Sequence, residues 1–145
     1  GMVQEGLQVL RAIRDRYDGE KRNPFNEIEC GSNYARAMSN FALLPIFSGF
    51  QFDMPNKHIG FSPLLDGNYK CMWNLGCAWG DFIRKENQYK IVVADGALPL
   101  SSLTLGALKP VKSVRIDGKS VDFTQKDNTL HFKDVTIRKS LVVEV

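Results

Sequence analysis

The chain has 145 residues, of which 43% are hydrophobic and 24% charged, as in an ordinary globular protein. Its net charge of +3 comes from 19 basic and 16 acidic residues spread along the sequence, without the dense Lys and Arg stripe of nucleic-acid-binding proteins. No apolar run approaches the roughly eighteen residues that cross a bilayer. We therefore expect one compact unit with neither a nucleic-acid partner nor a membrane span.

The cysteine and histidine content argues against both a disulfide framework and a metal centre. There are three cysteines, Cys30, Cys71 and Cys77, without a CxxC pair, and two histidines. Free thiols fit a reducing compartment, and the N-terminal residues lack the pattern of a secretory signal. We expect a cytoplasmic protein with no metal and no cofactor.

A helix is expected at the start of the chain. Apolar residues fall at helical spacing over residues 2–17, with basic residues mostly off that stripe, and Gly19 ends the pattern. The stripe consists of Val3, Leu7, Leu10 and Ile13.

A long ordered loop follows over residues 20–31, because the stretch has no periodicity and Pro24 disfavours helix before it. Ser32 or Asn33 can cap a second helix, whose apolar spacing continues through Phe47. Gly49 stands where that helix should stop.

After residue 53 the hydrophobic period changes from 3.6 to 2, which predicts strands. Asp117-Gly118 is a strong hairpin signal, and Asp95-Gly96 and Asp127-Asn128 indicate further turns. The strands are expected at residues 58–62, 69–75, 79–85, 89–94, 102–105, 112–116, 119–123, 129–132 and 141–144. Short strands at this spacing predict an antiparallel sandwich or curled sheet and, with the two helices, an α+β fold.

Glu27 and Arg36 form the first candidate site. Glu27 lies in the loop and Arg36 lies one turn into the second helix, so both can reach the same space. A carboxylate and a guanidinium together suit the hydroxyl groups of a sugar. The alternative is a plain ion pair that fastens the loop to the helix. Glu29 is explained by its position near the helix start, where a carboxylate is favoured.

No complete catalytic set is expected. Glu27 and Glu29 lie two residues apart on one loop, whereas the paired carboxylates of a glycosidase flank the bond from opposite sides. A second set of residues could form an aromatic sugar platform, although aromatic residues in strands more often fill a core or a sheet edge. That set is Tyr69, Trp73, Trp79 and Phe82.

Several stretches closely resemble one enzyme family. They are residues 14–19 (RDRYDG), 22–31 (RNPFNEIECG), 34–38 (YARAM), 48–53 (SGFQFD) and 59–63 (IGFSP). Together they resemble the C-terminal part of the catalytic region of glycoside hydrolase family 116, which includes non-lysosomal glucosylceramidases and bacterial β-glucosidases. Past Gly80 the similarity thins.

The resemblance implies that residues 2–53 correspond to the last helices of an (α/α)6 toroid and that residues 54–145 form the antiparallel β region, together one compact unit. It also implies that Glu27 and Arg36 hold the hydroxyl groups of glucose. The nucleophile and the acid/base of this retaining family lie upstream of the matching segment and have no counterpart here.

We therefore expect a C-terminal segment of a β-glucosidase-like or glucosylceramidase-like glycoside hydrolase, inactive alone. Its expected partners are glucose or a β-glucoside, and either a chain carrying the rest of the toroid or a second copy of itself. The alternative is a noncatalytic carbohydrate-binding or protein-interaction protein derived from that fold.

Overall fold

The structure, a computed structural model, describes residues 2–16 and 41–145. Contacts divide the chain into two units, residues 1–42 and residues 43–145. The described parts contain two short helices and two β-sheets, so the predicted mixture of α and β structure is confirmed, with β structure in the majority.

The first unit contributes one described helix, α1 (Val3–Arg14). It begins within one residue of the predicted start and ends three residues before the predicted end. Glu5 lies in its first turn and Arg14 in its last turn, which suits the helix dipole. None of its side chains is buried.

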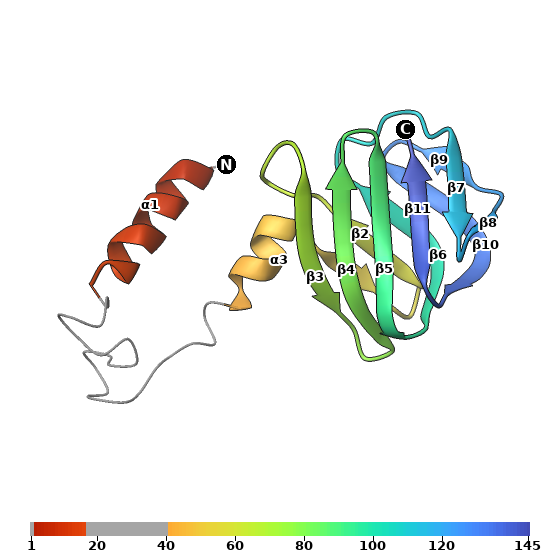
Figure 1. Cartoon of the computed structure of the whole chain (residues 1–145), viewed down its shortest axis with the longest axis horizontal. Coiled ribbons are helices and arrows are strands. Elements are labelled where there is room, and N and C mark those ends of the chain that lie inside the picture. Colours follow the sequence, from red (N-terminus) through yellow and green to blue (C-terminus); the bar gives the residue numbers. More distant parts are fainter. Residues whose placement is uncertain (1, 17–40) are drawn as a thin grey trace. The chain divides into compact units, whose positions relative to one another are not determined.

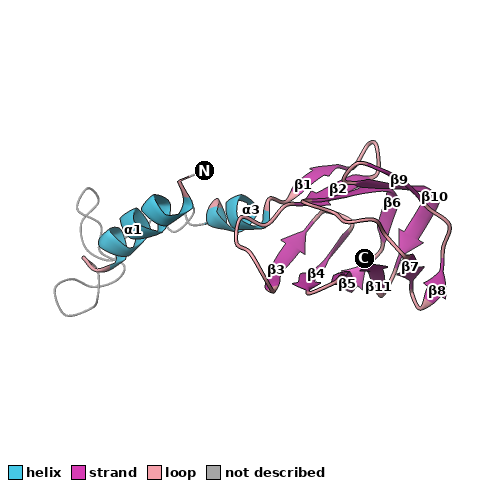
Figure 2. Ribbon diagram, turned by 90° about the horizontal axis from the view of Figure 1, so that it is seen from above, coloured by secondary structure: helices cyan, strands magenta, loops and turns pink. Residues whose placement is uncertain are grey.

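The second unit is a sandwich of two sheets (Figures 1 and 2). The first has the order β1-β2-β6-β10-β9 and the second the order β3-β4-β5-β11-β7-β8. All neighbouring strands are antiparallel except β2 and β6, which are parallel. The strands of the first sheet are β1 (Gln51–Asp53), β2 (His58–Phe61), β6 (Leu98–Leu105), β9 (Thr124–Lys126) and β10 (Thr129–Ile137). Those of the second are β3 (Tyr69–Asn74), β4 (Ala78–Lys85), β5 (Gln88–Gly96), β7 (Ser113–Ile116), β8 (Lys119–Ser120) and β11 (Ser140–Glu144).

The core lies between the sheets because alternate residues of each strand point inward. In β4, for example, Ala78, Gly80 and Phe82 are buried, whereas Trp79 is exposed. Aromatic rings connect the two layers: Phe61 of β2 stacks on Phe82 of β4 with ring centroids 4.1 Å apart. This stack extends to Phe50 on one side and to Tyr89 on the other.

A short helix, α3 (Leu43–Ser48), leads into the sandwich. It ends at Gly49, as predicted, with a left-handed φ of 56°. The Phe50 N–H donates to the Pro45 carbonyl over 3.3 Å, the bond of a Schellman C-cap. The Ser62 N–H donates to the Ser48 carbonyl over 3.0 Å, which attaches the end of β2 to this cap.

All nine predicted strands are present, with ends shifted by a few residues. Asp117 and Gly118 both have positive φ in the β7–β8 hairpin, as their sequence predicts. Strands β1 and β9 were not predicted: each has three residues, all exposed, and therefore shows no alternation. Strand β1 lies after the predicted helix stop at Gly49 and before residue 54, where the period of 2 is expected to begin.

Candidate functional site

The predicted sugar-binding pair, Glu27 and Arg36, lies outside the described residues, as do Glu29 and Cys30. The structure therefore places neither member of the pair, and their role stays a prediction. The described part offers several polar and aromatic groupings on the sandwich instead.

The predicted aromatic platform does not form as a set. Trp73 is 2% exposed and Phe82 is fully buried, so both belong to the core. Tyr69 is half-buried on the inner side of β3. Trp79 is the exception, because 49% of its side chain is exposed on the outer face of the six-stranded sheet. Trp73 and Phe82 are therefore core residues, as the alternative to a sugar platform predicted, whereas Trp79 is not part of the core.

A polar cavity of about 680 Å³ lies where the β4–β5 turn meets the last residues of β11. Glu144 is held at its edge by the Ser113 hydroxyl at 2.9 Å and by the Arg115 guanidinium at 2.5 Å. The lining residues are Asn68, Lys85, Glu86, Asn87, Gln88, Lys112, Glu144 and Val145. Two lysines face two carboxylates, so the lining is charge-balanced and rich in amide groups, which fits a neutral hydroxylated molecule better than a phosphate.

Sequence reasoning missed this cavity because its residues come from four separate segments. The one local signal is the polar run 84–88 between two alternating strands, which marks a turn rather than a site. The turn itself is specified by Glu86, which has a positive φ, and its N–H donates to the Asn68 side chain over 3.3 Å.

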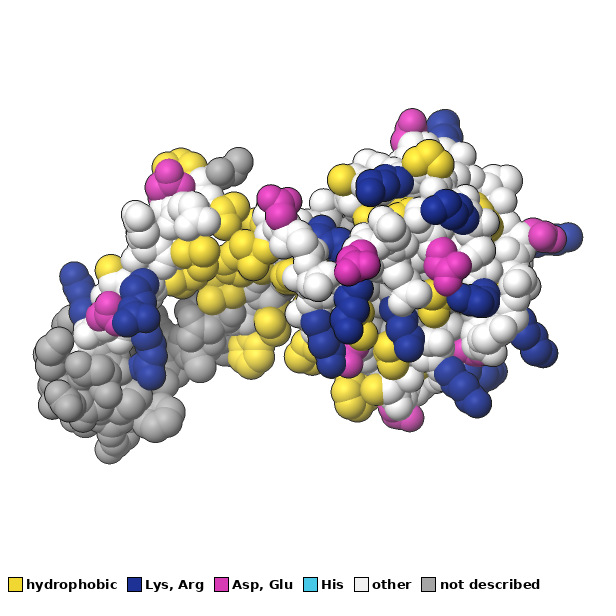
Figure 3. All heavy atoms as spheres, turned by 45° about the horizontal axis from the view of Figure 1, so that its top comes forward, with side chains coloured by type: hydrophobic (Ala, Val, Ile, Leu, Met, Phe, Trp, Pro, Cys, Tyr) yellow, Lys and Arg dark blue, Asp and Glu magenta, His cyan; other side chains and the backbone are white. Residues whose placement is uncertain are grey.

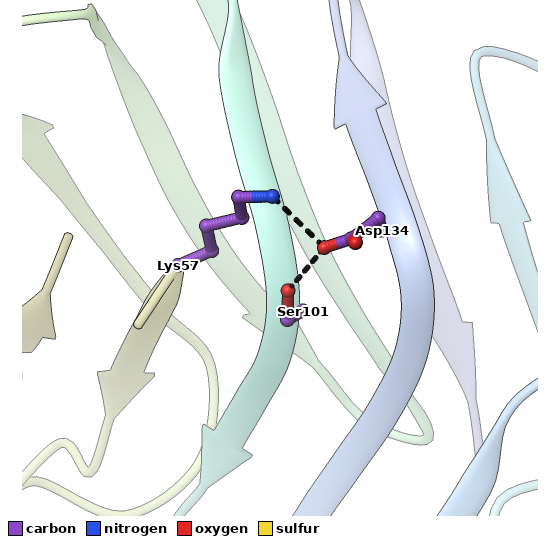
Figure 4. A network of polar contacts seen from close by, with 3 residues as sticks. All are labelled: Lys57, Ser101 and Asp134. Atoms are coloured by element: carbon purple, nitrogen blue, oxygen red, sulfur yellow. Dashed lines mark hydrogen bonds and ion pairs between the residues drawn. The ribbon is translucent and has the colours of Figure 1, made fainter. Parts of the chain in front are cut away.

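A network of Lys57, Ser101 and Asp134 lies on the five-stranded sheet, with Ser101 within β6, Asp134 within β10 and Lys57 just before β2 (Figure 4). The Asp134 carboxylate accepts from the Lys57 ammonium at 3.0 Å and from the Ser101 hydroxyl at 2.8 Å. Hydrogen bonds from Lys57 and Ser101 lower the pKa of Asp134. This carboxylate stands in the irregular part of β10, where pairing with β6 shifts register, so the network secures the bulge.

A row on the outer face of the same sheet places Asp53, His58 and Ser102 on adjacent strands. His58 Nδ1 lies 2.8 Å from the Ser102 hydroxyl. The Asp53 carboxylate, however, accepts from the backbone N–H and the side-chain amide of Asn56, at 3.3 and 2.7 Å. Asp53 therefore stabilises the β1–β2 turn, and the three residues do not have the geometry of a Ser-His-Asp triad.

The two described cysteines are free thiols, as predicted. Burial raises the pKa of Cys71 to about 11, with the nearby Asp81 carboxylate adding to the effect, whereas hydrogen bonding with Tyr69 and Ser48 acts the other way. Cys71 is therefore protonated at neutral pH and is a poor nucleophile. Cys77 is exposed in the β3–β4 turn.

Within residues 2–16 and 41–145, no three His, Cys, Asp or Glu side chains are grouped closely enough to hold a metal ion. Neither described helix has the length and apolar character needed to cross a membrane. Lys and Arg side chains are scattered over the sandwich face seen in Figure 3, with Asp and Glu side chains between them. No protein-family model matches the chain, and no curated protein is significantly similar to it.

Proposed function

We propose that this chain is the C-terminal segment of a β-glucosidase that resembles glycoside hydrolase family 116. In this proposal Glu27 and Arg36 position the hydroxyl groups of glucose, and another segment or chain supplies the nucleophile and the acid/base. The chain alone has no glucosidase activity.

The close packing of two family-like stretches is the observation that carries this proposal. Residues 48–53 and 59–63 both resemble the family, and they meet where α3 enters the sandwich. A Cβ at Gly49 would overlap the Ser62 carbonyl, and φ at this glycine is left-handed. The Ser48 hydroxyl, which is buried, donates to Leu44 and accepts from the Phe50 N–H. The resembling residues are thus those required by one junction, which supports their inheritance as a unit.

The surface of α1 supports the second part of the proposal. Leu7 and Ile13 of the apolar stripe are exposed, and Ile13 is 54% exposed. A 12-residue helix is only marginally stable by itself in water, so most of its stability must come from packing its apolar face. In a toroid, neighbouring helices cover such faces. We propose that the rest of a toroid on another chain, or a second copy of this chain, covers α1.

Binding of methyl β-glucoside to the full chain, measured by calorimetry, tests the sugar-positioning role. We expect millimolar affinity, at least about tenfold weaker binding in Glu27→Gln, and a comparable loss in Arg36→Lys because lysine lacks the planar fork. Lys126→Gln, on the exposed strand β9, is the matched control for loss of a charge and should bind normally. Absence of binding by the unmodified chain would contradict the role.

Hydrolysis of 4-nitrophenyl β-glucoside tests the missing chemistry. The purified chain should release no nitrophenol above background, whereas a mixture with a chain carrying the remaining toroid should. Turnover by the isolated chain that disappears in Glu27→Gln would overturn the assignment of catalysis to another segment.

The same exposed face of α1 also fits the alternative, a noncatalytic protein-interaction or carbohydrate-binding role. Binding of the glucoside without any activity in the mixture would favour this alternative. Light scattering that gives a monomer at all concentrations would argue against self-association.

A further inference from the structure

Trp79 is one of two tryptophans in the chain, and the two have opposite environments. Trp73 lies in the core, whereas about half of the Trp79 side chain is open to solvent on the outer face of the six-stranded sheet. An indole ring is large and apolar, so leaving it exposed forgoes a substantial gain from burial. An exposed aromatic ring with polar neighbours is a common element of ligand recognition.

Two polar side chains flank Trp79 on the same face. Asn74 of β3 and Asp95 of β5 are its direct partners on the adjacent strands. Directly opposed residues share a face, with Cβ atoms about 5 Å apart. Both flanking side chains are exposed, and within the described residues neither makes a hydrogen bond. The indole is thus bordered by an amide, which donates and accepts, and by a carboxylate, which accepts.

The backbone beneath this row is closely packed. The pairing of β4 with β5 shifts register between Trp79 and Gly80, so a bulge directs the indole. A Cβ at Gly80 would overlap the Val92 carbonyl, and one at Gly96 would overlap the Cys77 carbonyl, so β4 and β5 approach closely before and after Trp79. The β3–β4 turn is closed by the Leu75 N–H, which donates to the Ala78 carbonyl over 2.9 Å. These contacts define the backbone positions from which the three side chains project on one face.

We propose that Trp79, Asn74 and Asp95 form a carbohydrate-binding platform on the sandwich, which takes oligosaccharides of pyranose rings with equatorial hydroxyl groups. A β-linked glucose ring has equatorial substituents, so its C–H face can stack on the indole while its hydroxyl groups reach the flanking amide and carboxylate. The platform uses no residue of the Glu27 and Arg36 pair and stands independently of the proposed function.

The size of the apolar surface favours a sugar over a protein partner. A whole Trp side chain buries at most about 250 Å², so the half-exposed side chains of Trp79 and Met72 together remain far below the roughly 800 Å² that each partner contributes to a stable protein interface. The next row of the face brings in a charged pair, Lys70 and Asp81 at 3.0 Å, beside Met72. The exposed apolar surface around Trp79 therefore matches a single sugar ring.

The two indole N–H signals in a ¹H–¹⁵N spectrum of the full chain provide a direct test, with cellotetraose as the probe. Trp79→Phe assigns the signals because one of them disappears. We expect the Trp79 signal to shift with a saturable dependence on cellotetraose in the millimolar range and the Trp73 signal to stay in place. Glycerol at the same hydroxyl concentration should move neither signal.

Matched variants distinguish stacking of the sugar on the indole ring from a contact with any exposed apolar side chain. Trp79→Ala should weaken binding at least about tenfold, as for loss of an anchoring aromatic group, and Asn74→Ala or Asp95→Ala should weaken it severalfold. Met72→Ala is the control, because Met72 is equally exposed, at 50%, on the same face but has no ring. Its affinity should stay within twofold, and the unfolding midpoint of each variant shows whether the fold is intact.

Three results would overturn the proposal. The first is a Trp79 signal that does not move when cellotetraose is added. The second is an equal loss of affinity in Met72→Ala and Trp79→Ala. The third is a Trp79 signal that moves with protein concentration in the absence of sugar, which would mean that this face pairs with a second copy of the chain. Glu27→Gln should leave the Trp79 shift unchanged, so failure of the platform is distinguishable from failure of the Glu27 and Arg36 site.

Discussion

Helix α1 and the sandwich are built from similar proportions of apolar residues but use them differently. The described sandwich buries 21 hydrophobic side chains, whereas α1 buries none. The sandwich buries its apolar residues because each strand places alternate residues on one side and the two apolar faces pack against each other. An amphipathic helix needs a second surface, and its sequence pattern does not specify which one. The stability of the sandwich should therefore be insensitive to α1 and sensitive to its own core.

The largest expected effect concerns the stack that joins the sheets. Phe82→Ala removes a fully buried ring that lies 4.1 Å from Phe61, with the two rings nearly parallel. The free energy of unfolding should fall by about 3–5 kcal/mol, as for other buried Phe→Ala changes. Urea denaturation followed by circular dichroism measures this value. A loss below about 1 kcal/mol would show that the two sheets are not held together by this core.

Glycine positions at the junction provide the next test. Gly49→Ala introduces a Cβ that overlaps the Ser62 carbonyl and also forces a left-handed φ on alanine, which should cost about 3 kcal/mol or more. Gly67→Ala is the matched control: its φ is 75° but no atom lies near the new Cβ, so the expected cost is about 1 kcal/mol. Equal midpoints of thermal unfolding for the two variants would contradict the tight junction between α3 and β2.

Asp117 allows a test by pH. Its carboxylate accepts the N–H groups of Arg138, Lys139 and Ser140 at 2.8 to 3.0 Å. Partial burial acts to raise the pKa of Asp117, but these three donors outweigh it and hold the pKa below its ordinary value. Because the folded-state pKa is lowered, this stabilisation is fully present above the unfolded pKa of about 4 and is lost as the pH falls through the folded pKa.

Asp117→Asn should therefore destabilise the sandwich by about 1 kcal/mol at neutral pH, a modest value because the group is partly exposed. The difference between the variant and the unmodified chain should shrink as the pH falls below about 4. Chemical denaturation at pH 7 and at low pH measures both values. A constant difference across this range would exclude the carboxylate charge as the cause.

The strands could be predicted from the sequence because each has a buried and an exposed face, as in β4 and β5. Their pairing could not, since the parallel contact of β2 with β6 joins segments about forty residues apart in the sequence. The alternation of residues along β4 predicts that Trp79 and Phe82 point to opposite faces of the strand. Which of the two is exposed depends on which face the other sheet covers. The polar cavity likewise depends on strand order, because its lining comes from segments that are brought together at one end of the six-stranded sheet. The Glu27 and Arg36 pair follows from local sequence alone and stays a prediction.

Substitutions in α1 should have the smallest effect on the stability of the sandwich. Replacing the exposed Leu7 and Ile13 by Ser removes two apolar side chains of the first unit that are not buried, so the free energy of unfolding of the sandwich should change by less than about 0.5 kcal/mol. Association with a toroid-bearing chain, measured by light scattering, should nevertheless be lost, because the same face would supply that interface. Gln4→Ser and Gln8→Ser, on exposed positions of the same helix, provide the control for altered helix propensity. A large loss of sandwich stability in the Leu7 and Ile13 variant alone would mean that α1 belongs to the core of the sandwich, and the helix would then need no second chain.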